Sequence, residues 1–397
     1  MRTRLESDPP PPPAEAQALS EQLQARLRER MREAGGSLPF DAYMQAALYE
    51  PGLGYYSAGL AKLGPAGDFS TAPELAGLFS ATLALQCAEV LARTGGVILE
   101  LGAGTGRMAA DILAELERRE ALPAQYLILE VSAHLRQVQR ETLAERVPHL
   151  AGRVAWLERL PEQPIDGVLL ANEVLDALPV KRFALEPDGG LREYHVTPAE
   201  EGFTWSLQAP GAALAAAVEG IQKDLAAPLG EYHSEWCPGL ADWLTALAGV
   251  MNRGAMLFVD YGYPRREYYH PQRHMGTLVC HYRHRGHDNP LLLTGLQDIT
   301  AFVDFTAAAR AGLDAGLSLL GYNTQAQFLL GAGLPRLMEE ALEGGDEHVY
   351  LQLAQQAKRL LLPGDMGERF KVLALGRDYP DALAGFSLHD QSERLGV

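Results

Sequence analysis

Three glycines at alternate positions form the stretch of this sequence best suited to bind a cofactor. They are Gly102, Gly104 and Gly106. They follow a strand-like segment, 97–101, and precede a helix-like segment, 107–119. A strand, a glycine-rich turn and a helix start in this order bring backbone N–H groups close to a ligand, because no Cβ atom stands in the way. The stretch therefore predicts a site for a nucleotide-like ligand.

The spacing within the turn favours one class of such ligands. A dinucleotide-binding turn follows the pattern GxGxxG, and its third small residue would stand at position 107. This chain has Arg107 there, which counts against a pyrophosphate held at the helix start. We interpret the turn as the site of a nucleoside with an amino-acid tail, namely S-adenosyl-L-methionine. A nicotinamide-dependent dehydrogenase is the alternative that Arg107 argues against.

Two carboxylates lie where this cofactor would need them. Glu130 ends the next predicted strand, a position from which a carboxylate accepts hydrogen bonds from both ribose hydroxyls. The alternative for Glu130 is a strand-end acid that faces water. Glu100 stands inside an apolar strand, which costs free energy unless the carboxylate is paired, so we expect it to meet the α-amino group of the cofactor. Ser132, at the start of the following helix, is a further candidate cofactor contact.

The end of a later buried strand carries the residues that suit catalysis. Asn172 and Glu173 follow this strand, and Asp176 comes shortly after them. Methyl transfer is a displacement at carbon, so the enzyme must hold the nucleophile in line and keep it either unprotonated or flanked by negative charge. Carboxylates suit a cationic nucleophile such as a guanidinium, which they grip bidentately. We expect Glu173 and Asp176 to be catalytic and Asn172 to contact the cofactor. The alternative for Asp176 is a cap on the next helical turn.

The elements that must position these residues alternate between strand and helix. This alternation predicts an α/β fold with a doubly wound parallel sheet, and the continuous apolar strands predict helices on both of its faces. The predicted strands are 97–101, 126–130, 154–157, 167–171, 255–260 and 370–375, and the predicted helices are 14–33, 37–49, 74–93, 107–119 and 133–146.

Two long segments interrupt the alternation, and both leave the carboxyl edge of the sheet, where ligands bind in such folds. We expect them to recognise the substrate. The predicted organisation is a proline-rich leader with an N-terminal helix (1–36), a helical cap (37–93), a cofactor-binding core (94–185), an insertion (186–252), a core strand (253–262), a second insertion that forms the substrate-recognition region (263–362), and a C-terminal core strand with the tail (363–397).

Composition narrows the partners and the compartment. The net charge of −17 argues against a nucleic acid as the main partner. The three cysteines are widely spaced, which is typical of a reducing compartment. No apolar run is long enough for a membrane span, and the first residues show neither a secretory signal nor a transit peptide. We therefore expect a cytoplasmic protein; the oligomeric state stays open.

A histidine-rich stretch and a loop near the N-terminus supply further candidates. The histidines are His270, His274, His281, His284 and His287. A closed zinc site usually includes cysteines at tighter spacing, so we expect no metal here. We expect His284 and His287 to face the substrate instead. The same role is expected of Asp68, Thr71 and Glu74, which belong to a loop rich in turn residues.

Several motifs in combination resemble the MidA-like methyltransferases. They are DAYM at 41–44, LYEPGLGYY at 48–56, GDFSTAPE at 67–74, ELGAGTGR at 100–107, EVSAHLR at 130–136 with Gln139, NEVLDALP at 172–179, DYG at 260–262, the block 281–288, DITAFVDF at 298–305, Thr324-Gln with Phe328-Leu, and Met366-Gly with Phe370-Lys-Val. The resemblance covers nearly the whole chain from Leu38 onward. It implies a seven-stranded, class I (Rossmann-like) methyltransferase fold with S-adenosyl-L-methionine as cofactor.

The resemblance also implies roles for individual residues and a class of substrate. Gly102, Gly104, Gly106 and Glu130 match the cofactor-binding positions of the family, although this chain has Gly-Ala-Gly where many relatives have Gly-Pro-Gly. The mitochondrial members are complex I assembly factors that methylate an arginine of a core subunit. The resemblance therefore implies protein arginine methylation, with a protein substrate that could be a subunit of respiratory complex I. The alternative is an assembly factor or chaperone that keeps the fold without transferring methyl groups.

Overall fold

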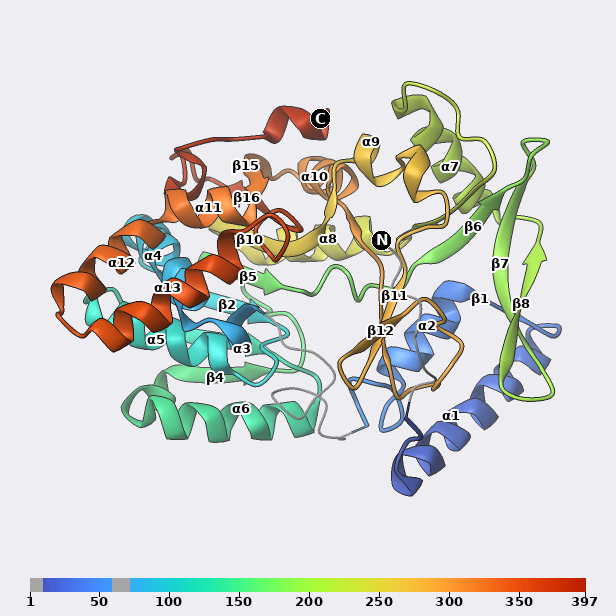
Figure 1. Cartoon of the computed structure of the whole chain (residues 1–397), viewed down its shortest axis with the longest axis horizontal. Helices are drawn as coiled ribbons and strands as arrows, with labels where there is room; N and C mark the ends of the chain where they lie inside the picture. The colour runs from blue at the N-terminus through green and yellow to red at the C-terminus, as the bar shows by residue number, and fades with distance from the viewer. Residues whose placement is uncertain (1–9, 59–71) are drawn as a thin grey trace. The chain divides into compact units, whose positions relative to one another are not determined.

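The computed structural model describes residues 10–58 and 72–397, and these residues form two compact units (Figure 1). Unit 1 comprises the described residues of Met1–Phe69, together with Asp176–Leu240 and Tyr263–Asp304. Unit 2 comprises the described residues of Ser70–Leu175, together with Ala241–Gly262 and Phe305–Val397. The chain therefore passes between the units five times, and each unit is described by itself below.

Unit 2 is built around a mixed β-sheet (Figure 1). Seven of its described strands follow one another in the order β15-β16-β10-β5-β2-β3-β4. Their bounds are β2 Val97–Leu101, β3 Tyr126–Leu129, β4 Val154–Leu157, β5 Ile165–Asn172, β10 Met251–Tyr263, β15 Ser318–Thr324 and β16 Phe370–Arg377. The five strands from β4 to β10 are parallel, whereas β16 runs antiparallel to both β10 and β15. This is the α/β fold of the class I methyltransferases.

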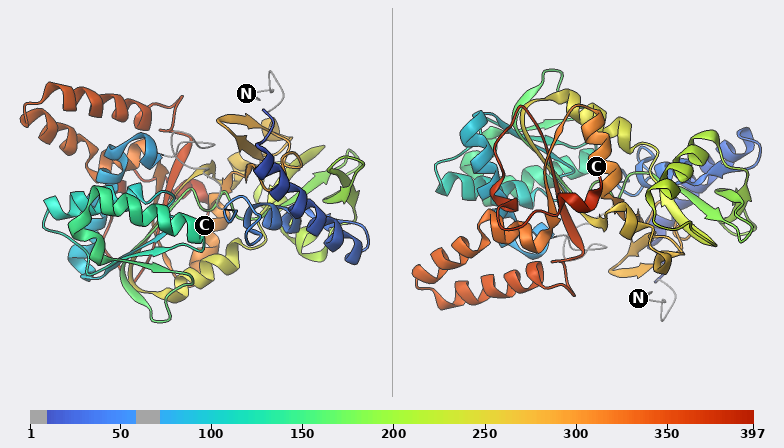
Figure 2. Two further views of the ribbon diagram at one scale, coloured as in Figure 1. Left: turned by 90° about the horizontal axis from the view of Figure 1, so that it is seen from below. Right: turned by 90° about the horizontal axis from the view of Figure 1, so that it is seen from above.

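The expectation of a parallel sheet is wrong at the end of the sheet formed by β15 and β16. The segment between β15 and β16 starts and ends at the same edge of the sheet, so β16 returns in the opposite direction. That segment consists of helices α11 (Gln325–Ala332), α12 (Leu334–Glu343) and α13 (Glu347–Leu361). Both views in Figure 2 show α12 and α13 lying side by side. Helices on this route do not cross to the opposite edge, as a parallel connection requires.

Helices cover both faces of this sheet, as the apolar strands predict. On one face, Ile98 and Leu170 pack in a buried cluster with side chains of α4 (Gly77–Thr94) and α5 (Arg107–Arg118). On the other face, Phe258 of β10 contacts Trp243 of α8 (Leu240–Val250), with ring centroids 6.0 Å apart. Burying each large apolar side chain contributes about 1.5–3 kcal/mol. The remaining helices of unit 2 are α3 (Ala72–Leu75), α6 (Ala133–Arg146) and α10 (Phe305–Asp314).

The predicted helices 14–33 and 133–146 are confirmed with the same ends, as α1 (Ala14–Glu33) and α6. The helix expected over 74–93 is instead two helices, α3 and α4. They are separated by Ala76, whose extended backbone (φ −148°, ψ 100°) cannot continue a helix. The helix expected from position 37 begins at Phe40, as α2 (Phe40–Tyr49), because Leu38–Pro39 forms the short strand β1.

Unit 1 contains two antiparallel sheets. The larger has the order β1-β7-β6-β9, with β8 paired to β7, and the smaller has the order β12-β11-β13. Val196 of β7 packs in a cluster with α1 and α2, whereas Phe183 of β6 packs with α7 (Ala212–Asp224). Strand bounds are β6 Lys181–Leu185, β7 Leu191–Pro198, β8 Phe203–Gln208, β9 Tyr232–Trp236, β11 Val279–Tyr282, β12 Arg285–His287 and β13 Asp298–Thr300; the short α9 is Arg265–Tyr268.

Among the residues that the structure describes, no helix combines the length and the apolar character that crossing a membrane requires.

Candidate functional site

The glycine turn joins β2 to α5 and has the backbone that its sequence predicts. Gly102, Gly104 and Gly106 have φ values of 64°, 55° and 83°, in the left-handed region where residues with a Cβ atom are strained. Gly106 is also the N-cap of α5, and no side chain caps this helix end. A Cβ atom at Gly106 would lie 3.0 Å from the Cα atom of Gln139, so the turn packs tightly against α6. The turn thus reaches a helix N-terminus that no side chain caps, and Gly102 at its start is exposed.

Glu130 stands beside this turn and is held in a fixed orientation. It is buried, and its Oε1 atom accepts a hydrogen bond from the Ser132 N–H at 2.8 Å. Its Oε2 atom accepts one from the Gln139 side-chain amide at 3.2 Å. Burial raises the pKa of Glu130, while the bonds from Ser132 and Gln139 oppose that rise. The carboxylate is therefore oriented before any ligand arrives.

Gln139 links the turn to Glu130, a role that sequence reasoning missed. Its side-chain N–H donates to the Gly104 carbonyl at 3.0 Å as well as to Glu130. Its side-chain oxygen accepts a hydrogen bond from the Trp156 indole N–H at 2.9 Å. Gln139 lies two turns after Ser132, the residue whose hydroxyl caps α6 by accepting from the Leu135 N–H. Only its place in the family motif marks Gln139 in the sequence.

Glu100 is buried in β2 and is paired, as its surroundings require. The Tyr126 hydroxyl donates a hydrogen bond to the Glu100 Oε2 atom at 2.7 Å. The pKa of Glu100 is raised to about 7. Burial is the largest cause and the charge of Glu130 adds to it, whereas the hydrogen bond from Tyr126 lowers the pKa. The partner that the structure shows is therefore a tyrosine of the neighbouring strand.

The end of β5 brings Asn172 and Glu173 next to the glycine turn. β5 pairs with β2 in parallel, with Leu101 opposite Ala171, so both strands end at the same edge. A Cβ atom at Gly102 would lie 3.3 Å from the Val174 side chain. Glu173 has a φ of 53°, which is a strained conformation for a residue with a side chain. Residues strained in this way cluster at functional sites. The Asn172 side-chain amide donates to the Glu173 carboxylate at 3.3 Å.

Glu74 also reaches this edge of the sheet. Its carboxylate accepts a hydrogen bond from the Thr105 hydroxyl, within the glycine turn. The Arg107 guanidinium donates to the Glu74 carbonyl at 3.2 Å. The structure thus gathers Glu74 with the predicted cofactor residues in unit 2.

The other predicted substrate-side residues belong to unit 1 or lie outside the described residues. Asp176 is buried, and its carbonyl accepts from the Ala301 N–H at 2.9 Å. His284 has a φ of 61°, and burial lowers the pKa of His287. Asp68 and Thr71 lie outside the residues that the structure describes.

Asp260, near the end of β10, is the second residue of this edge that sequence reasoning did not single out. It is buried, and its Oδ2 atom accepts hydrogen bonds from the backbone N–H groups of Val174 and Leu175. A strand-end acid in a buried strand is a signal of the kind that identified Glu130. Asp260 thus contacts the backbone immediately after Glu173.

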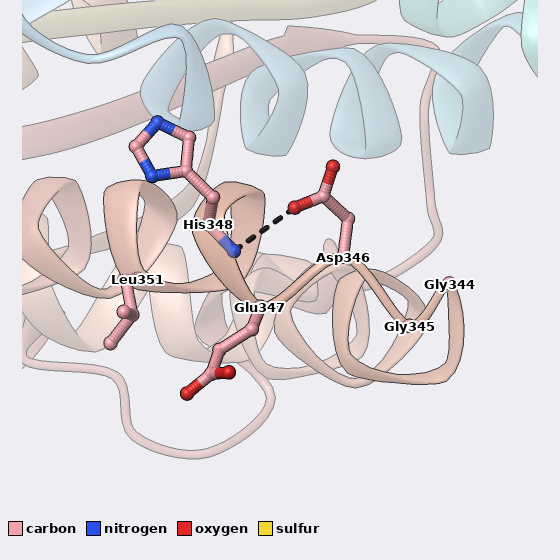
Figure 3. A pocket seen from close by; sticks show the side chains of 6 residues that line it. All are labelled: Gly344, Gly345, Asp346, Glu347, His348 and Leu351. Atoms are coloured by element: carbon pink, nitrogen blue, oxygen red, sulfur yellow. Dashed lines mark hydrogen bonds between the residues drawn. The ribbon is translucent and has the colours of Figure 1, made fainter.

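A hollow elsewhere in unit 2 holds none of these residues. It lies at the turn between α12 and α13 and is open to solvent (Figure 3). The Asp346 carboxylate there accepts hydrogen bonds from the His348 and Val349 N–H groups, as a helix N-cap does. Over residues 10–58 and 72–397, no group of three acidic, histidine or cysteine side chains is placed to hold a metal ion.

Comparisons with known proteins identify the family and the cofactor. The model of a family described as S-adenosyl-L-methionine-dependent methyltransferase matches residues 82–323. A crystal structure of a Burkholderia thailandensis protein bound to S-adenosyl-homocysteine is similar over 97% of this chain and 100% of that one, with 42% identity and a TM-score of 0.91. A native crystal structure of a protein from the same organism is 41% identical over the same shares, with a TM-score of 0.88.

Curated relatives are more distant in sequence but match most of the chain. The protein arginine methyltransferase NDUFAF7, mitochondrial, of Danio rerio is 30% identical over 374 residues, 86% of this chain and 84% of its own length. The Homo sapiens protein of the same name is 29% identical over 86% of this chain and 80% of its own length. The cofactor is S-adenosyl-L-methionine. This chain belongs to the MidA-like family of S-adenosyl-L-methionine-dependent methyltransferases.

Proposed function

We propose that this methyltransferase transfers a methyl group to an arginine side chain of a protein. The observation that carries the proposal is the position of Glu173. Its backbone is strained, and it directly follows β5 beside the glycine turn. A carboxylate there would grip a guanidinium and aim one of its nitrogens at the cofactor. The relatives named as protein arginine methyltransferases support the same choice of substrate.

The residues present fit the cofactor. The glycine turn at 102–106 would bind its amino-acid tail, and the oriented Glu130 would accept hydrogen bonds from its ribose hydroxyls. Ser132, which bonds to Glu130, and Asn172, at the end of β5, would also contact the cofactor. Glu100 would pair with the α-amino group of the cofactor. When bound, S-adenosyl-L-methionine supplies an electrophilic methyl group.

The chain's own residues would orient the acceptor, add negative charge beside it and line its approach. Glu173 would orient the guanidinium and hold its positive charge next to the turn, with Asn172 fixing the Glu173 side chain. Asp176 would add a second carboxylate on the substrate side. Asp68, Thr71, Glu74, His284 and His287 would line the approach of the protein, and the insertions 186–252 and 263–362 would recognise it. A subunit of respiratory complex I is the substrate that the family relation favours.

The test is a comparison of methylated arginine in the proteins of cells with and without the gene, by mass spectrometry. Loss of a specific methylarginine from the cells that lack the gene supports the proposal. An identical set of methylarginines in both cells, together with a stable partner complex of the purified protein, would favour a non-catalytic assembly factor.

Replacing Gln139 with leucine should weaken cofactor binding about tenfold. The change keeps the size of the side chain but removes its bonds to Gly104, Glu130 and Trp156. A tenfold effect corresponds to about 1.4 kcal/mol, less than the three bonds together, because they hold the turn and Glu130 rather than the cofactor itself. Isothermal titration with S-adenosyl-L-methionine measures the effect. The control is Gln137→Leu on the same helix, whose exposed side chain donates a hydrogen bond to Glu141 at 2.7 Å. Equal affinity of the Gln139 variant and the wild type would contradict the role of Gln139.

Replacing Glu100 with glutamine should make the protein more stable above neutral pH. The pKa of Glu100 is about 7 in the folded protein and 4.5 in the unfolded chain, so stability is lost as pH rises from 4.5 through 7. A shift of this size corresponds to about 3 kcal/mol as an upper bound. The stabilisation by Glu100→Gln should therefore be small at pH 5 and grow towards pH 8, in urea unfolding of both proteins. The exposed Glu145→Gln serves as the control, and a pH-independent difference would refute the assignment.

A further inference from the structure

Asp260 lies near the end of β10, the strand next to β5, at the edge of the sheet that carries the glycine turn. β10 and β5 pair in parallel, with Val259 opposite Asn172. The next backbone bond, from the Glu173 N–H to the Val259 carbonyl at 2.9 Å, is the last one between these strands. Beyond it the chain turns away from the sheet, so the backbone after Glu173 needs another partner.

The Asp260 carboxylate provides that partner. Its Oδ2 atom accepts hydrogen bonds from the Val174 N–H at 3.2 Å and from the Leu175 N–H at 2.9 Å. Its Oδ1 atom accepts one from the Tyr261 N–H at 2.9 Å, which fixes the carboxylate to its own strand. The side chain is almost fully buried, with the residue only 1% exposed. Water therefore cannot easily replace these bonds if the carboxylate is removed.

The backbone that Asp260 holds is strained at the residue with the proposed chemistry. Glu173 adopts a φ of 53°, a conformation that persists only where the surroundings determine it. Its own N–H is fixed by Val259, and the two following N–H groups are fixed by Asp260. Released from Asp260, the turn would relax, and the Glu173 side chain would lose its direction.

We propose that Asp260 is a positioning residue, whose carboxylate fixes the turn 173–175 and thereby aims Glu173 at the acceptor. The inference rests on the proposed function for its effect on catalysis, but the anchoring of the turn can be tested without it. The hydrogen bonds of Asp260 described above come from the backbone N–H groups of Tyr261, Val174 and Leu175, so we expect its effect to be on the rate of transfer rather than on cofactor binding.

The test compares the full-length wild type with Asp260→Asn and Asp260→Ser. Hydrogen exchange should become faster at the amides of Val174 and Leu175 and stay unchanged at Gly102–Gly106. The affinity for S-adenosyl-L-methionine should stay near that of the wild type. With labelled S-adenosyl-L-methionine and a protein extract from cells that lack the gene, transfer at saturating cofactor should fall about 100-fold, the loss typical of a misplaced reacting group.

Two further variants separate positioning from a general effect on structure. Glu173→Gln combined with Asp260→Asn should be no slower than Glu173→Gln alone, because both changes act on one function. Glu235→Gln is the matched control, since Glu235 is fully buried in unit 1 and accepts hydrogen bonds from Thr277 at 2.7 and 3.0 Å. It should leave exchange at Val174 and Leu175 unchanged.

Unchanged exchange at these two amides, an additive loss in the double variant, or a loss of cofactor affinity equal to the loss of rate would each overturn the proposal. Failure of both Asp260 variants to fold would show a general structural role and would also overturn it. If the wild type itself transfers no methyl group, the proposed function fails, and exchange at the two amides alone then decides whether Asp260 anchors the turn.

Discussion

Replacing Glu173 with glutamine should lower the rate of methyl transfer by at least about 100-fold and leave the affinity for S-adenosyl-L-methionine unchanged. Glutamine keeps the size of the side chain and tolerates the same left-handed backbone as glutamate, so the turn at the end of β5 keeps its shape. It removes the negative charge that would hold a guanidinium in two parallel hydrogen bonds. The loss should therefore appear in the rate at saturating cofactor and in the KM of the protein acceptor.

The measurement is transfer of a labelled methyl group at saturating S-adenosyl-L-methionine, with calorimetric titration of the cofactor alongside. Glu162→Gln is a suitable control, because Glu162 is exposed and pairs only at the surface with Arg159. Wild-type transfer by the Glu173 variant would remove the observation on which the proposed function rests. A loss of cofactor affinity as large as the loss of rate would instead place Glu173 in the cofactor site.

Replacing Glu130 with alanine should raise the Kd for S-adenosyl-L-methionine about 100-fold. Two hydrogen bonds from ribose hydroxyls to a charged acceptor together contribute about 3 kcal/mol, and this sum corresponds to a factor of about 100. The variant also leaves the Ser132 N–H and the Gln139 amide without their acceptor. At saturating cofactor the rate should recover, because Glu130 would bind the ground state and the transition state equally.

Titration of the variant with S-adenosyl-L-methionine and with S-adenosyl-homocysteine measures this effect. Both compounds carry the same ribose, so both affinities should fall by the same factor. A decrease for only one of them would contradict ribose binding by Glu130. The control is Glu158→Ala, an exposed acid of the same region whose partner is Arg136.

Sequence patterns predicted the part of the fold that local chemistry determines. β2 and β4 have the predicted ends, because short apolar strands between turn residues admit one interpretation. The Ser132 cap places the start of α6, since its hydroxyl accepts the bond that the pattern requires. The glycine spacing likewise predicted a sharp turn, and all three glycines have positive φ values in the structure.

The direction of β16 and the presence of β15 could not be predicted in this way. β15 has the sequence Ser-Leu-Leu-Gly-Tyr-Asn-Thr, whose period does not distinguish a strand from a helix. Whether β16 runs parallel or antiparallel depends on how α11, α12 and α13 pack, which is a tertiary property. The contacts of Gln139 with Gly104 and of Asp260 with Val174 and Leu175 are also tertiary, because they join segments distant in the chain.

The most direct test of the account is transfer of a labelled methyl group by the purified protein. The acceptor is a protein extract from cells that lack the gene, and hydrolysis followed by amino-acid analysis identifies the labelled residue. We predict label in methylated arginine with the wild type and almost none with Glu173→Gln. Label confined to another amino acid, or equal labelling of arginine by the Glu173 variant, would contradict the account.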